Sequence, residues 1–276
     1  MTSNQQTIIA IDGHVHLHDS SALAVLLDQA RSNFLRSCPQ ATQGLLLLTQ
    51  TNTSPDFKTI HRQFDNSNSK NSWTLNATSE PHSWKAIAHD GWQLWLITGR
   101  QLVSSEGLEV LIFGDEQGKN GMTTGELINT GRATKSLVIL PWGVGKWLGN
   151  RGKIVSKLLA ELTDEQLILG DNGARPALWH WVKQFSTAHQ LGIRVLRGTD
   201  SLPLSGEINR VGSFGAAIQG ALDPNHPTVS LLHLLADPSV TMENFGNNMG
   251  LINFICKQIQ LRFLQAKKNQ TGERFQ

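Results

Sequence analysis

The chain has 276 residues, of which 39% are hydrophobic and 17% are charged, and its formal net charge is +2 at pH 7. This length suits one large domain or two small ones, and the small net charge argues against nucleic acid as the main partner. Two cysteines exclude a disulfide framework, and the absence of a signal peptide or long apolar run predicts a soluble, cytoplasmic protein without a transmembrane segment.

The hydrophobic periodicity predicts an alternation of short strands and helices. In chain order these are strand 7–17, helix 20–37, strand 44–49, helix 56–64, strands 73–78, 84–88, 92–98 and 108–113, helix 124–129, strand 137–140, helix 151–161, strand 167–169, helix 176–189, strand 193–196, and helices 214–222 and 228–235. Such an alternation favours a mainly parallel sheet, open or closed. The turn at 104–107 makes 92–113 an antiparallel hairpin within it.

Two histidines close the first predicted strand. His14 and His16 are two residues apart, so on a strand they point to the same face and can converge on one metal ion. An apolar strand that ends in His-x-His is typical of a metal-hydrolase barrel. The alternative is a pair of buried, hydrogen-bonded histidines.

Two later strands end in a carboxylate, Asp171 and Asp200. In a parallel barrel the carboxyl ends of the strands surround one mouth, where active sites form. A carboxylate there can bind a metal ion or orient an attacking water. The alternative for both residues is a turn aspartate that accepts bonds from nearby backbone.

Cations cluster near the same mouth. The glycine-rich segment 143–153 contains Lys146 and Arg151 and precedes a helix, which is an arrangement that binds anions. Arg175 and Arg197 flank the mouth. These four residues predict a small anionic substrate, and the alternative for 143–153 is a solvated loop.

The tail at 252–268 has apolar residues at helical spacing together with basic residues. We expect this helix to pack on its own domain. The alternatives are that it lies on a membrane surface or binds a partner protein.

Taken in order, several segments resemble the motifs of the PHP family of metal-dependent phosphoesterases. Asp12-Gly13-His14-Val15-His16 matches the opening Asp-x-His-x-His of that family, and the later similarities lie at 44–52, 99–114, 138–141 and 198–202. The resemblance implies a distorted (β/α)7 TIM-like barrel with an antiparallel hairpin insertion. It further implies a single domain over 1–276, with a C-terminal helical extension at about 228–270.

The chain departs from this family at most metal-ligand positions, which hold Gln50, Thr51, Gln101, Glu109, Leu140 and Leu202. The ligands that remain are His14, His16 and Asp200, and Glu109 adds an oxygen. These ligands suit at most one divalent ion of zinc, manganese or iron, whose bound water acts as nucleophile. Asp171 is then the predicted general base.

Three hypotheses follow from this sequence. The first is a single-metal hydrolase of the phosphoesterase class that acts on a small anionic, phosphorylated substrate. The second is a non-catalytic barrel without metal that binds an anionic ligand or a protein. The third is a structural subunit that docks through its C-terminal helix. Metal content separates the first two.

Overall fold

The computed structural model describes residues 7–19, 22–52, 54, 56–64, 72–115, 117–161 and 167–271. The strands are β1 (Ile8–Val15), β2 (Gln43–Gln50), β3 (Trp73–Ala77), β4 (Ser83–Ala88), β5 (Gln93–Val103), β6 (Glu109–Phe113), β7 (Leu137–Pro141), β8 (Leu167–Asn172), β9 (Val195–Gly198), β10 (Gly215–Gln219) and β11 (Met242–Phe245). The helices are α1 (Leu23–Ser37), α2 (Phe57–Gln63), α3 (Thr124–Ala133), α4 (Gly149–Glu161), α5 (Lys183–Gln190), α6 (Pro227–Ala236) and α7 (Leu251–Thr271).

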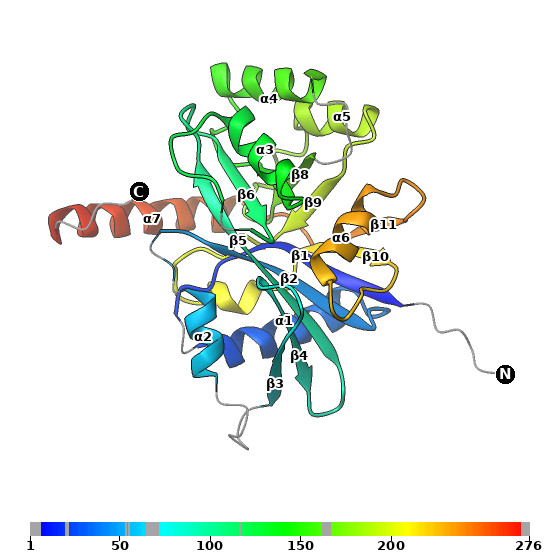
Figure 1. The fold of residues 1–276 in the computed structure, drawn as a ribbon. Coiled ribbons are helices and arrows are strands. Elements are labelled where there is room, and N and C mark those ends of the chain that lie inside the picture. The colour runs from blue at the N-terminus through cyan, green and yellow to red at the C-terminus, as the bar shows by residue number, and fades with distance from the viewer. Residues whose placement is uncertain are drawn as a thin grey trace.

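These strands form one curved sheet that nearly closes into a barrel (Figure 1). The order is β11-β10-β1-β2-β5-β6-β7-β8-β9, and the β3–β4 hairpin pairs with the first half of β5. β1, β2, β5, β7, β8 and β9 run in one direction, so their carboxyl ends share one rim. β6 runs antiparallel between β5 and β7, which confirms the predicted hairpin. The α/β barrel-like architecture is confirmed as well.

Alternate residues along the strands pack on opposite sides of the sheet. The side chains that fill the barrel come from neighbouring strands, as Ile9, Ile11, Leu45, Leu47, Trp95, Ile97, Leu111, Phe113, Ile139, Ile168 and Leu196. The other face of β1 and β2 packs against α1, and that of β6, β7 and β8 packs against α3 and α4. Because apolar side chains fill the interior, polar chemistry is concentrated at the rim.

The last parallel strand, β9, returns beside β1 and brings distant parts of the chain together. The backbone N–H of Asp200 donates to the His14 carbonyl at 2.7 Å, and that of Thr199 donates to the Asp12 carboxylate at 2.8 Å. Gly198 is required at this seam, because a β-carbon there would lie 2.3 Å from the His14 backbone nitrogen. The seam therefore fixes Asp200 against the end of β1.

The helix predicted at 214–222 is wrong, because the strand β10 occupies this segment. β10 pairs antiparallel with β1 and sets Ile218 opposite Ile9. Gly215 allows the close approach, since a β-carbon there would lie 2.0 Å from the Ile11 carbonyl oxygen. The alanine-rich sequence is compatible with a helix, but pairing with a distant strand overrides the local preference.

The helix predicted from Pro176 begins only at Lys183, the first residue of α5. The preceding loop is tethered instead. The backbone N–H of Ala177 donates to the Met249 carbonyl at 2.8 Å, and the Trp179 carbonyl accepts from the Arg175 guanidinium at 2.5 Å. The pairing with the distant Met249 and the local bond from Arg175 hold the loop away from helical geometry.

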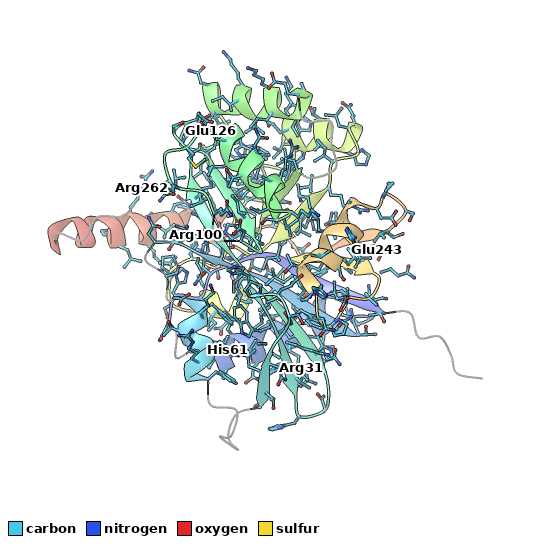
Figure 2. The ribbon with its side chains drawn as sticks, in the orientation of Figure 1. Arg31, His61, Arg100, Glu126, Glu243 and Arg262 are labelled. Atoms are coloured by element: carbon cyan, nitrogen blue, oxygen red, sulfur yellow. The ribbon has the colours of Figure 1, made fainter. Side chains whose placement is uncertain are left out.

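The helical extension predicted at about 228–270 is wrong in its middle, where β11 returns to the sheet beside β10. α7 then runs outward from the barrel (Figure 1), and Figure 2 shows Arg262 on it, clear of the sheet. The expected packing on the domain is only partial, since the Lys257 ammonium forms an ion pair with the buried Glu207 whereas Ile252 is 78% exposed and Phe263 is 72% exposed. Across the described ranges, no helix is both long enough and apolar enough to cross a membrane.

Candidate metal centre

Two imidazoles and one carboxylate meet at the rim where β1 and β9 end. The Nε2 atoms of His14 and His16 lie 3.0 Å apart. The Asp200 Oδ1 atom lies 3.7 Å from Nε2 of His14 and 3.4 Å from Nε2 of His16. Both histidines are buried, and Asp200 is largely buried. The structure therefore brings together three residues singled out by the sequence, and they form a candidate metal-binding triad.

The hydrogen bonding of His16 determines which of its ring nitrogens carries a lone pair. Its Nδ1 lies 2.9 Å from the Thr49 carbonyl oxygen. A carbonyl only accepts, so Nδ1 carries the proton and the neutral ring has its lone pair on Nε2. This lone pair points at His14 Nε2 and at the carboxylate. A backbone acceptor that fixes the tautomer of a ligand histidine is common in metal sites.

The three separations fit a tetrahedral ion. Bonds of about 2.0–2.2 Å from zinc to imidazole nitrogen or carboxylate oxygen place neighbouring tetrahedral ligands about 3.3–3.5 Å apart. The observed 3.0, 3.4 and 3.7 Å bracket that range. Two neutral imidazoles and one carboxylate also form a donor set typical of a catalytic zinc or iron site with open positions.

The backbone and a neighbouring amide orient Asp200. Its φ is 47°, in the left-handed region that side-chain-bearing residues seldom adopt. Such backbone conformations gather at functional sites. The Asn172 side chain at the end of β8 donates to the Asp200 Oδ2 atom, leaving Oδ1 toward the histidines. Asn172 was not among the predicted site residues, because Asp-Asn-Gly after a strand is equally typical of a turn.

A buried carboxylate braces the seam beneath the triad. Asp12 accepts from the backbone N–H and hydroxyl of Thr199 at 2.8 and 2.6 Å and from the Gly212 N–H at 2.8 Å. Burial raises the pKa of Asp12 to about 6, although these hydrogen bonds lower it. Within the described residues Asp12 is not part of the ligand group, and it acts as a structural link between the start and end of the barrel.

Burial and neighbouring groups shift the ionisation of His14 and Asp200. It lowers the pKa of His14 from 6.5 to about 4, against the raising effect of the Asp200 charge. Burial alone would raise the pKa of Asp200, but the neighbouring His14 and His16 and the hydrogen bond from Asn172 hold it below its usual value. Near neutral pH the site therefore contains a neutral His14 and an ionised Asp200, the forms that bind metal.

The lowered pKa of His14 predicts acid lability of the metal-free protein. Its contribution to stability is fully present above pH 6.5 and is lost as pH falls toward 4, because the unfolded chain binds the proton first. Between pH 7 and 4.5 the unfolding free energy should fall by about 2–3 kcal/mol more in the natural protein than in His14→Gln. Urea unfolding in the presence of a chelator measures this difference. Equal pH dependence in both proteins would contradict it.

Glu109, predicted as an additional ligand, lies beside Lys146 instead of within the triad. Its carboxylate forms an ion pair with the Lys146 ammonium and accepts from the Gln101 amide at 3.0 Å. In the described part of the chain, the ligand group whose atoms lie within 4.8 Å of one another contains His14, His16 and Asp200 but not Glu109. Lys146 is therefore neutralised locally.

Asp171 lies at the end of β8 and holds two arginines. Its two oxygens accept from Nε and Nη2 of Arg175 at 2.7 and 2.8 Å, and Arg197 Nε lies 3.7 Å away. Arg197 also stacks over the Phe214 ring at 4.8 Å. Both carboxylate oxygens are thus engaged, and Asp171 and Arg175 are buried. The fourth predicted cation, Arg151, donates to the backbone carbonyls of Gly107 and Gly145.

A cavity of about 350 Å³ opens beside the triad. Its lining includes His16, His18 and Ser201 together with the apolar Leu202, Pro203 and Leu204. The His18 Nε2 atom lies 2.7 Å from the Ser201 carbonyl oxygen, and its ring is stacked 5.6 Å from that of His16. Sequence reasoning missed His18 and Ser201, because a polar residue just after a strand usually faces solvent.

Comparisons with known proteins place the fold among solved structures. Comparison with protein-family models gave no match, and comparison with curated proteins gave none either. The crystal structure of PsfC from Pseudomonas syringae PB-5123 is similar, with a TM-score of 0.53 and 11% identity, over 93% of this chain and 98% of PsfC. The lesion-specific endonuclease PfuEndoQ from Pyrococcus furiosus gives a TM-score of 0.50 and 11% identity, over 86% of this chain. This chain matches 58% of the endonuclease's length, and at this identity both likenesses concern the fold alone.

Proposed function

We propose that this chain is a metal-dependent hydrolase of the phosphoesterase class that uses a single divalent ion and a small anionic, phosphorylated substrate. The observation that carries the proposal is the spacing of 3.0 to 3.7 Å among Nε2 of His14, Nε2 of His16 and Oδ1 of Asp200. We also propose that β1, β2 and β5 to β9 form the seven-stranded PHP-type barrel of a single domain.

The triad would bind the metal ion, and residues around it would bind and orient the substrate. His14, His16 and Asp200 would hold the ion, which when bound supplies a water of lowered pKa and polarises a phosphoryl oxygen. His18 and Ser201 line the adjacent cavity and can orient a substrate there. Arg197 remains partly exposed and supplies positive charge at the rim.

The sequence also predicts Asp171 as general base. Protonation of Asp171 would remove the charge that pairs with Arg175 and Arg197. Breaking a buried ion pair costs about 3–5 kcal/mol, which opposes that role. We therefore propose that Asp171 holds the two guanidinium groups in place for the anion rather than moving a proton.

The proposal is tested by metal-loaded hydrolysis of p-nitrophenyl phosphate and bis-p-nitrophenyl phosphate. The protein loaded with zinc, manganese or iron should hydrolyse at least one of these esters, and a chelator should abolish the reaction. His16→Ala should lower the rate at least about 100-fold, because it removes a metal ligand. Mutating a group that merely hydrogen-bonds to such a ligand commonly lowers metal affinity or activity 10–100-fold. Hydrolysis that survives in both chelator and His16→Ala would contradict the proposal.

A non-catalytic barrel that binds an anionic ligand is the second candidate. Two features that weaken metal binding favour it: most ligand positions are substituted, and Glu109 pairs with Lys146 instead of joining the triad. This candidate predicts that the protein holds no metal ion and binds inorganic phosphate without hydrolysing either ester.

A further inference from the structure

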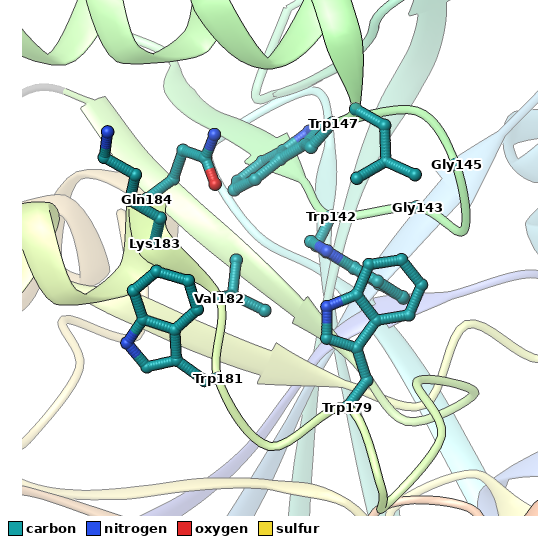
Figure 3. A pocket seen from close by; sticks show the side chains of 10 residues that line it. Trp142, Gly143, Gly145, Trp147, Trp179, Trp181, Val182, Lys183 and Gln184 are labelled. Carbon is teal, nitrogen blue, oxygen red and sulfur yellow. The ribbon is translucent and has the colours of Figure 1, made fainter.

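A second cavity, of about 200 Å³, lies between the loops that follow β7 and β8. Four tryptophans line it, two from each loop, as Figure 3 shows: Trp142, Trp147, Trp179 and Trp181. The protein contains eight tryptophans and no tyrosine, so half of its indoles gather at one cavity. The cavity is separate from the one beside the triad, which is lined by other residues.

Three of the indoles are fixed in place by the protein itself. Trp142 is 2% exposed, and its ring meets that of Trp179 edge to face, with centroids 5.3 Å apart. Trp147 is 4% exposed and packs at 71° against Phe185. The Trp179 carbonyl accepts from Arg175, which ties this wall to the Asp171 cluster. A preformed wall loses little conformational entropy when a ligand binds.

Trp181 differs from the other three because its indole is 62% exposed. Figure 3 shows it across the cavity from Trp142 and Trp179. A large aromatic surface left open to water at the edge of an aromatic cavity is the arrangement that stacks a flat ring. The volume of about 200 Å³ is below the roughly 300–1,000 Å³ of cavities for whole drug-sized ligands, so it suits one ring system.

The polar lining indicates the charge of the ligand. Lys183, at the first position of α5, is exposed beside the cavity and makes no ion pair within the described residues. A lysine there disfavours a cationic ligand and favours an anion. The buried Gln184 donates through Nε2 to the Gly152 carbonyl at 3.3 Å and presents its carboxamide oxygen toward the cavity (Figure 3). That oxygen can accept from a ring N–H or amino group.

The strand ends beside this cavity also carry residues of the proposed reaction site. Trp142 directly follows β7, and its backbone N–H donates to the Gly170 carbonyl of β8 at 2.8 Å. Pro141, just before it, lies with His14 and Asp171 around the mouth of the barrel interior. A ligand could place its ring among the tryptophans and its anionic group toward the arginines of the rim.

We infer that the four-tryptophan cavity binds a planar heteroaromatic ring, such as a nucleobase, carried by an anionic ligand of the nucleotide class. The inference that this ligand is the substrate rests on the proposed hydrolase function, whereas binding of the ring itself needs no metal. In this site Trp181 would stack on the ring of the ligand, and Lys183 would supply the positive charge beside it.

The inference is tested by titrating the protein with the four common nucleoside 5′-monophosphates, with ribose 5-phosphate as the ringless match. Intrinsic tryptophan fluorescence and calorimetry both report binding. At least one nucleotide should bind about 5–100-fold more tightly than ribose 5-phosphate, as one stacked base commonly contributes. Trp181→Ala should remove that preference, Trp181→Phe should keep most of it, and Leu178→Ala in the same loop should leave it unchanged.

Two outcomes would overturn the inference: nucleotides and ribose 5-phosphate bind equally, or the preference survives Trp181→Ala. Circular dichroism of Trp181→Ala checks that the variant is folded, and the exposure of this residue makes folding the expected result. The double variant His14→Ala/His16→Ala separates the two proposals. Suppose that the double variant still prefers nucleotides and that the natural protein hydrolyses neither ester. This result would refute the hydrolase proposal but support the ring-binding site.

Discussion

The variant His14→Ala/His16→Ala is expected to lose the ability to bind one equivalent of divalent metal ion. Two of the three ligand atoms disappear, and Asp200 alone is a weak monodentate site. The loss of affinity should exceed about 100-fold, which is the upper range for disturbing residues that merely support ligands. Equilibrium dialysis followed by elemental mass spectrometry measures this loss directly.

His18→Ala is the matched control for that experiment. His18 lies next to His16, but its Nε2 faces the Ser201 carbonyl oxygen instead of the triad. This variant should keep metal binding within about tenfold, because it removes no ligand. If His18→Ala and the double variant lose metal equally, the assignment of His14 and His16 as the histidine ligands is wrong.

Gly198→Val is expected to open the barrel seam and abolish the metal site together with it. A β-carbon at this position would lie 2.3 Å from the His14 nitrogen, 2.7 Å from His14 Cβ and 2.8 Å from the Gly13 carbonyl carbon. Two of these three atoms belong to the backbone, so they can be displaced only if β1 moves as well. We expect a loss of stability of about 3 kcal/mol or more, at or beyond the upper end for an overpacked core.

Gly125→Ala provides the control for Gly198→Val. Gly125 lies inside α3, and an added β-carbon meets no heavy atom within 4 Å. This change should stabilise the protein by up to about 1 kcal/mol, because alanine favours the helix. Thermal unfolding and zinc titration of both variants make the comparison. A stable Gly198→Val that still binds zinc would show that the seam does not position Asp200.

Short-range signals predicted most of the fold. The histidine pair could be located because a strand with period two sends His14 and His16 to one side, and nothing distant is needed for that. The strand ends could be located from their glycine and polar turns. In contrast, β10 was mistaken for a helix, since its pairing with β1 lies about 200 residues away along the chain. β11 was missed because its partner is β10, whose place in the sheet depends in turn on β1.

The candidate site was predicted less completely than the fold. The sequence marked Asp200 as the end of a strand, but only the return of β9 to β1 brings its carboxylate to the histidines. The role of Asn172 depends on the neighbouring position of β8 and β9, which no local pattern reveals. Likewise, the charges of Lys146 and Arg175 were visible in the sequence, whereas their partners Glu109 and Asp171 were not identifiable as partners.

X-ray absorption at the metal edge of the protein loaded with one equivalent of zinc tests the central assignment most directly. We expect four or five nitrogen and oxygen neighbours at about 2.0–2.2 Å, with the outer-shell scattering of two imidazoles. That imidazole signal should disappear in His14→Ala/His16→Ala. A spectrum of hydrated zinc in the natural protein, without imidazole scattering, would contradict the account.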